Sequence, residues 1–216
     1  MNIQKNLMRC GALLAAVLAL APSALAADAE TASVPAVQLI PAVRTVQTDW
    51  RLLLVNPWNT VPEGYKIQLA TLSNGLQVDE RIYDDLDDML TDCREAGLSP
   101  IVCSAYRTEA TQTRLYRNKV ARVRASGVPE DQVEAEAARW VAKPGTSEHQ
   151  TGLALDIVAA SYQILDEKQE DTAEQKWLME NSWKYGFILR YPSEKSDITG
   201  IGYEPWHYRY VGKAAA

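Results

Sequence analysis

The stretch SEHQTGLALD, residues 147–156, places a histidine and a carboxylate on either side of a turn into an apolar strand. The strand is expected over residues 152–158, where apolar side chains alternate between two faces. One face carries Leu153, Leu155 and Ile157. Asp156 therefore projects from the other face of an apolar strand. A carboxylate there needs a partner, because burying an unpaired charge is costly.

A second short segment, YEPWHY at residues 203–208, contains the other histidine of a chain that has only two. His207 follows Glu204 by three residues, as ligands can do on a helix. Pro205 argues against that arrangement, because the residue before a proline is pushed toward extended or turn conformations. Two histidines, one carboxylate and an open position form a common type of catalytic zinc site. The two segments together suggest one such site.

A zinc hydrolase needs three protein ligands, an open position for water, a general base and a group that stabilises the oxyanion. His149, Asp156 and His207 can fill the ligand positions. Glu204 is the natural base, because it could reach a water on the metal. Arg107 follows an expected strand at a loop, where it could face a developing oxyanion.

Each of these residues also has a purely structural explanation. The two histidines could be ordinary core or surface residues, and Asp156 could cap a turn or pair with a lysine. Glu204 could lie in a surface turn, and Arg107 could be a solvated charge. A nucleophile mechanism has less support: the chain has no G-x-S-x-G motif, and Cys93 and Cys103 have no local catalytic signature. Spacing alone leaves the metal site and the structural explanations open.

Residues 1–26 have the pattern of a signal peptide. Lys5 and Arg9 form a positive start, residues 11–21 are apolar, and residues 24–26 read Ala-Leu-Ala. The apolar run is shorter than the ~20 residues of a comfortable membrane span. We expect cleavage after Ala26; the alternative is an uncleaved N-terminal anchor, the one route by which this chain would contact a membrane.

Residues 27–49 are expected to form a linker to a domain over residues 50–213. Loss of residues 1–26 removes two cations and no acid, so the mature chain is more acidic than the net charge of −6 for the whole sequence. Such a chain is a poor candidate for binding nucleic acid or an anionic membrane surface. Cys93 and Cys103 then remain, and they either form a disulfide or are buried as small apolar residues.

Helices and short strands alternate irregularly along the domain. Helices are expected over residues 84–96, 109–125, 130–142 and 172–185. Strands are expected over residues 50–55, 65–72, 76–78, 101–106, 152–158, 187–191 and 206–211. Gly97 suits the end of the first helix, Thr108 the start of the second, and Trp140 the inner face of the third. This pattern favours an α+β fold with a mostly antiparallel sheet flanked by helices.

Several motifs, taken in order, resemble the zinc D-Ala-D-Ala carboxypeptidases, which include the vancomycin-resistance D,D-carboxypeptidases and D,D-dipeptidases. The first are S-x-H-x-x-G-x-A-x-D at residues 147–156 and EPWH at 204–207. The others are LVNP at 54–57, VDER at 78–81, SAYRT at 104–108, GFILRYP at 186–192 and YRYVG at 208–212. Ala105 stands where that family usually has glycine, which is a mild departure. The resemblance covers roughly residues 50–213.

The resemblance implies a zinc domain like that of the hedgehog signalling proteins, with one zinc ion per chain. It assigns zinc to His149, Asp156 and His207, base function to Glu204 and transition-state stabilisation to Arg107. It also places further residues near the substrate: Ser147, Gln112, Ser104, Tyr106 and Arg190.

The activity that the resemblance implies is removal of the terminal D-Ala from peptidoglycan stem pentapeptides, outside the cytoplasmic membrane at the cell wall. The alternatives are a D,D-dipeptidase or peptidoglycan endopeptidase on the same scaffold, and a non-catalytic module that binds the cell wall. The intact ligand set and Glu204 argue against the last.

Overall fold

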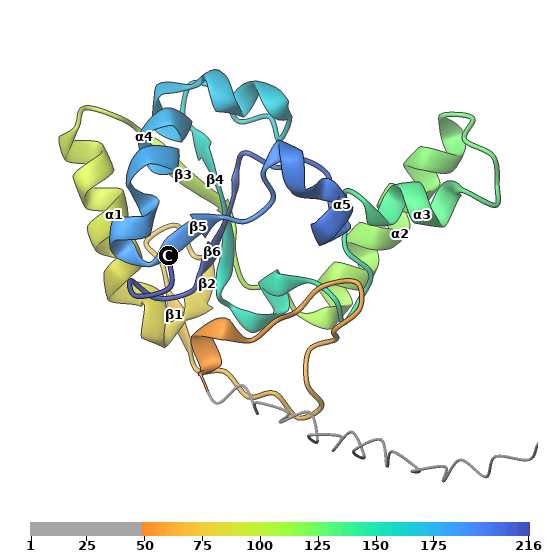
Figure 1. The fold of residues 1–216 in the computed structure, drawn as a ribbon, viewed down its shortest axis with the longest axis horizontal. Coiled ribbons are helices and arrows are strands. Elements are labelled where there is room, and N and C mark those ends of the chain that lie inside the picture. Colours follow the sequence, from red (N-terminus) through yellow and green to blue (C-terminus); the bar gives the residue numbers. More distant parts are fainter. Residues whose placement is uncertain (1–48) are drawn as a thin grey trace, which may run out of the picture. The chain divides into compact units, whose positions relative to one another are not determined.

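The computed structural model describes residues 49–216 of the chain (Figure 1). The signal peptide predicted over residues 1–26 lies outside the described residues, as does all but the last residue of the linker predicted over 27–49. Both stay predictions. Within residues 49–216, no helix has both the length and the apolar character needed to cross a membrane.

The main sheet has four strands in the order β3-β4-β6-β5, and every pairing in it is antiparallel. Its strands are β3 (Pro100–Ser104), β4 (Ala154–Ala159), β5 (Phe187–Leu189) and β6 (His207–Tyr210). A separate hairpin pairs β1 (Leu69–Thr71) with β2 (Gln77–Asp79). The predicted α+β class with a mostly antiparallel sheet is confirmed.

The helices form two groups around this sheet (Figure 1). They are α1 (Tyr83–Glu95), α2 (Glu109–Ala125), α3 (Val133–Ala138), α4 (Ala173–Asn181) and α5 (Ser196–Thr199). Helices α1 and α4 contact each other and the sheet, whereas α2 and α3 pair with each other on the opposite side of the view. Helices α1 and α4 cover the hydrophobic core. Helix α2 lines a pocket together with Asp156, on the other face of the sheet.

Strand β4 is buried along its whole length and separates the core from the functional side chains. Leu155 and Ile157 belong to a cluster of fully buried residues that α1 and α4 complete. Because side chains alternate across a strand, Asp156 points to the other face. Substitution of Leu155 by alanine in such a core typically lowers the free energy of unfolding by about 2–5 kcal/mol. The apolar face of β4 therefore fixes where its single carboxylate points.

Several local predictions are confirmed by the same residues that suggested them. Helix α2 spans residues 109–125 as expected, and the Thr108 side chain accepts a hydrogen bond from the backbone N–H of Thr111. Gly97 follows α1 with φ +83°, a conformation that glycine adopts without a steric cost. Helix α2 therefore begins at its predicted cap and α1 is followed by its predicted glycine, whereas the helix predicted over 172–185 ends at Asn181 and a 3-10 turn follows it.

Other predictions need correction. Residues 50–55 are not a strand: Trp50–Leu52 is a single 3-10 turn, and the Asp49 carboxylate caps it by accepting from Arg51 N. Helix α3 is shorter than the predicted 130–142. Its Val133 is buried as expected, but Trp140 lies beyond its end and is only half-buried.

Cys93 and Cys103 are free thiols in the structure, so the disulfide is not formed, and burial, the other alternative, holds for Cys93 but is wrong for Cys103, which is exposed. Cys93 is fully buried on α1. Cys103 lies on β3, where its Sγ is 3.5 Å from the backbone oxygen of Asp156.

Candidate metal centre

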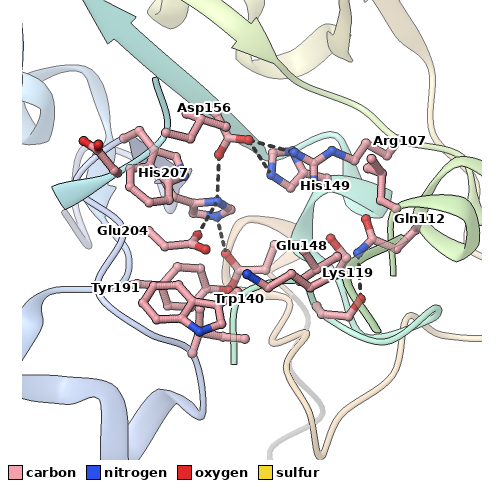
Figure 2. Close-up of a pocket in the computed structure, with 18 of the residues that line it drawn as sticks. Arg107, Gln112, Lys119, Trp140, Glu148, His149, Asp156, Tyr191, Glu204 and His207 are labelled. Atoms are coloured by element: carbon pink, nitrogen blue, oxygen red, sulfur yellow. Dashed lines mark hydrogen bonds and ion pairs between the residues drawn. The ribbon is translucent and has the colours of Figure 1, made fainter. Parts of the chain in front are cut away.

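The three predicted ligands converge, with one donor atom of each lying within 4.8 Å of the others (Figure 2). His149 lies in the 3-10 turn η3 (Glu148–Thr151), Asp156 lies on β4 and His207 begins β6. No more than 3% of any of these residues is exposed. The two histidines therefore lie in one buried cluster with Asp156, as a shared metal site would require.

Strand register explains why Asp156 and His207 meet. They are direct partners in the antiparallel pairing of β4 with β6, so their side chains leave the same face of the sheet. His149 reaches them because the chain turns sharply at Gly152, which has φ +71°. A Cβ at Gly152 would lie 2.8 Å from the backbone nitrogen of Asp79, so this turn requires glycine.

Each imidazole directs one nitrogen into the centre. His149 Nδ1 lies 2.8 Å from the Ala105 carbonyl oxygen, so Nδ1 carries the proton and donates, and Nε2 faces Asp156 at 3.3 Å. His207 Nδ1 lies 3.1 Å from Asp156 Oδ1. Two inward nitrogens and a carboxylate form a ligand set typical of zinc, with an open position on the pocket side.

The electrostatics of the centre differ between its two histidines. Burial and the charge of Arg107 lower the pKa of His149 to about 4, so this imidazole is neutral. Burial disfavours the charged form of Asp156, but His149 and His207 outweigh it and hold the pKa of that carboxyl well below its usual value. Burial also opposes protonation of His207, but hydrogen bonding to Asp156 and Glu148 raises its pKa to about 9. The donor set and the charges around it therefore fit a bound metal cation.

Glu204 lies beside the ligands without being one of them. Its Oε2 is 3.7 Å from His207 Nδ1, and only 7% of the residue is exposed. Burial raises the pKa of Glu204 to about 8; a metal ion nearby would favour the carboxylate instead. This placement suits a group that exchanges a proton with a water at the metal.

Arg107 is also at the centre, but it contacts a ligand in this structure. Its Nη2 lies 2.7 Å from Asp156 Oδ2 and also donates to Ser104 Oγ at 2.7 Å. Ser104 thus holds Arg107 and does not line the pocket, and neither does Tyr106. Arg190, also considered near the substrate, instead pairs with Glu148.

A pocket of about 750 Å³ opens over the centre, and both Ser147 and Gln112 line it as predicted. Gln112 is fully buried, and its Nε2 donates to the Ala142 carbonyl oxygen at 2.7 Å. Within residues 49–216, its Oε1 has no hydrogen-bond partner. Gln112 therefore offers an acceptor to a donor from a ligand, such as a peptide N–H.

Glu148 is the residue of the centre that the sequence did not identify. It is buried, and its Oε1 accepts from Arg190 Nε at 2.8 Å and lies 3.1 Å from Arg209 Nη1. Its Oε2 points toward His207 (Figure 2). Arg209 and His207 lie on the same face of the strand expected over residues 206–211. Because a buried arginine needs a partner, this placement is the one signal in the sequence for a carboxylate nearby.

Comparisons with known proteins agree with this centre. A family model described as VanY, D-alanyl-D-alanine carboxypeptidase, matches residues 75–213. An Enterococcus faecalis D-alanyl-D-alanine carboxypeptidase is 46% identical over 170 residues, which cover 79% of this chain. The chain spans 62% of the length of that protein.

Two solved structures are similar in both fold and sequence. VanYB in complex with D-alanine-D-alanine has a TM-score of 0.71 and 47% identity, covering 77% of this chain and 90% of the other. A mutant of the vancomycin-resistance D,D-pentapeptidase VanY in complex with Zn(II) has a TM-score of 0.70 and 46% identity, covering 77% and 91%. Since the family match includes every residue of the centre, the chain belongs to the VanY family of D-alanyl-D-alanine carboxypeptidases.

Proposed function

We propose that this protein is a zinc-dependent D,D-carboxypeptidase that removes the terminal D-Ala from peptidoglycan stem peptides. The observation that carries the proposal is the buried Glu204 carboxylate beside three converging ligands, at the base of an open pocket. The similar proteins that bind Zn(II) and D-alanine-D-alanine support the same metal and substrate.

His149 would hold the zinc through Nε2, His207 through Nδ1 and Asp156 through its carboxylate. When bound, zinc supplies a Lewis acid that polarises a carbonyl group and acidifies a water molecule. Because the three ligands are fixed by a turn and by two paired strands, the protein determines the position of the metal before substrate arrives.

Glu204 would take a proton from the attacking water and give it to the amine of the departing D-Ala. Arg107 would donate to the oxygen of the scissile carbonyl as negative charge develops there. For this, Arg107 must release Asp156 Oδ2, to which it donates in this structure. In place of Arg107, that oxygen would then have the bound metal as its partner. Gln112 Oε1 would accept from a substrate amide, which orients the peptide.

Product analysis tests this function. The purified protein is incubated with a stem pentapeptide, with free D-Ala-D-Ala and with a cross-linked stem peptide, each before and after treatment with a chelator. Release of D-Ala from the pentapeptide, lost with chelator and restored by zinc, is the expected result. Cleavage of the free dipeptide alone would indicate a dipeptidase, and cleavage of cross-linked peptides alone an endopeptidase.

We also propose that the protein acts outside the cytoplasmic membrane. The pattern of residues 1–26 and the peptidoglycan substrate support this location. N-terminal sequencing of protein recovered from producing cells gives the test. A mature chain that begins at Ala27 is expected, whereas a chain that retains Met1 and stays in the cytoplasm contradicts export.

A further inference from the structure

A second hollow, of about 740 Å³, adjoins the pocket over the metal centre. It lies between α2 and α3, and its lining includes Val123 and Ala135. Lys119 and Arg122 line both hollows. These two cations therefore lie where the pocket over the metal centre meets the second hollow, along α2.

The face of α2 that lines the pocket is regular. Gln112, Leu115, Lys119 and Arg122 recur at spacings of three and four residues, which places them on one side of the helix. A helix rises about 1.5 Å per residue, so Lys119 lies ~10 Å and Arg122 ~15 Å along the axis from Gln112. An extended peptide covers about 3.3–3.6 Å per residue, so three or four residues span this distance.

Neither cation has a carboxylate partner. Arg124 of α2 pairs with Glu130, and Lys143 pairs with Glu134. Among the described residues, Arg114 and Arg117 of α2 also have no carboxylate partner, but both are exposed and neither lines the pocket. Among residues 49–216, no carboxylate oxygen lies within 4.0 Å of the Lys119 or Arg122 nitrogens, although the chain as a whole is acidic.

Lys119 is held toward the pocket. Its Nζ lies 5.4 Å from the centre of the Trp140 ring (Figure 2). Partial burial and the charge of Arg122 lower the pKa of Lys119, and the charges of Glu136 and Glu204 act in the opposite direction. A partly buried ammonium group without a counter-ion favours an anion that enters from solvent.

We propose that Lys119 and Arg122 together bind a carboxylate of the peptide substrate. The proposal rests on the proposed function and extends it to the parts of the substrate that carry a free carboxylate. Two carboxylates have this chemistry: the C-terminal carboxylate of the last D-Ala, and the free carboxylate of an acidic residue upstream in the stem peptide, such as γ-linked D-Glu.

The test compares three stem pentapeptides: one with both carboxylates free, one in which the upstream carboxylate is an amide, and one in which the C-terminal carboxylate is an amide. They are hydrolysed by the wild-type protein and by the double variant Lys119→Gln, Arg122→Gln. The matched control is Arg114→Gln, Arg117→Gln, because both residues are exposed on the opposite side of α2.

The wild-type protein and the control are expected to hydrolyse one amidated peptide with kcat/KM about tenfold lower than the free peptide, mainly through KM. The amide that has this effect identifies the carboxylate. The Lys119, Arg122 variant is expected to hydrolyse the free peptide as poorly as that amide, while it still binds zinc.

If the Lys119, Arg122 variant hydrolyses all three peptides with the kcat/KM and KM of the wild-type protein, the subsite is overturned and the proposed function stays intact. Equal losses in the control would also overturn it, because they would reflect the general charge of α2. If the wild-type protein releases no D-Ala from any peptide, the proposed function itself fails, and the subsite fails with it.

Discussion

Glu148 Oε2 lies 3.5 Å from His207 Nε2, and neither atom has another hydrogen-bond partner in the described part of the chain. The other oxygen of Glu148 is held by Arg190 and Arg209, which fix the carboxylate in place. A carboxylate beside the outer nitrogen of a ligand histidine favours the tautomer that leaves the inner nitrogen free for metal. Glu148 is therefore placed to orient His207 from the side of the ring away from Asp156.

We predict that Glu148→Gln weakens zinc binding about 10–100-fold, the usual effect of losing such a partner. The amide cannot provide the negative charge that stabilises the His207 N–H and the two arginines. Competition with a chromophoric zinc chelator measures the dissociation constant. Glu134→Gln, at an exposed carboxylate, is the control. Unchanged zinc affinity in a folded Glu148→Gln variant would remove Glu148 from this role.

Gly152→Ala is expected to destabilise the protein more than Gly75→Ala. Both residues have positive φ, so each substitution carries a backbone cost of about 1–2 kcal/mol. Only at Gly152 would the new Cβ also meet the Asp79 backbone, at 2.8 Å, whereas Gly75 has open space. Urea denaturation measures both free energies of unfolding. Equal losses of unfolding free energy at the two positions would contradict the close packing of Gly152 against the Asp79 backbone.

Gln112→Leu is expected to raise KM for stem peptides several-fold while leaving zinc affinity unchanged. The substitution keeps the approximate volume of this pocket-lining side chain but removes the buried acceptor Oε1, which has no partner among the described residues. It also leaves the Ala142 carbonyl oxygen without its donor, so urea denaturation should accompany the kinetics. A stable variant with wild-type KM would exclude Gln112 from substrate binding.

Much of the fold follows from local signals. Helix α2 could be predicted because Thr108 caps it and its residues favour a helix, and β4 because its apolar side chains alternate. Residues 50–55 misled the prediction, since a short apolar run does not by itself distinguish a strand from other buried segments. There a side-chain contact between Asp49 and Arg51 decides the conformation.

The sequence identifies those residues of the candidate site whose side-chain type is itself typical of metal binding or proton transfer. His149, Asp156, His207 and Glu204 stand out because histidines are rare in this chain and carboxylates accompany both. The role of Glu148 depends on Arg190 and Arg209, which are distant in sequence, so only folding brings the three together. The present contact of Arg107 with Asp156 likewise depends on tertiary structure.

Removal of the metal tests the ligand set through stability. A ligand that binds only the folded state at ~1,000 times its Kd stabilises it by about 4 kcal/mol, so chelation should lower Tm by several degrees. His207→Ala should have a low Tm that no longer responds to zinc. A variant that keeps the full zinc-dependent shift would exclude His207 as a ligand.

The most direct test of the whole account measures zinc content and D-Ala release together in the Glu204→Gln variant. We predict about one zinc per chain, as in the wild-type protein, and at least a hundredfold slower release of D-Ala from stem pentapeptide, consistent with loss of a general base. A variant that retains zinc and releases D-Ala at a rate near that of the wild-type protein would contradict the account.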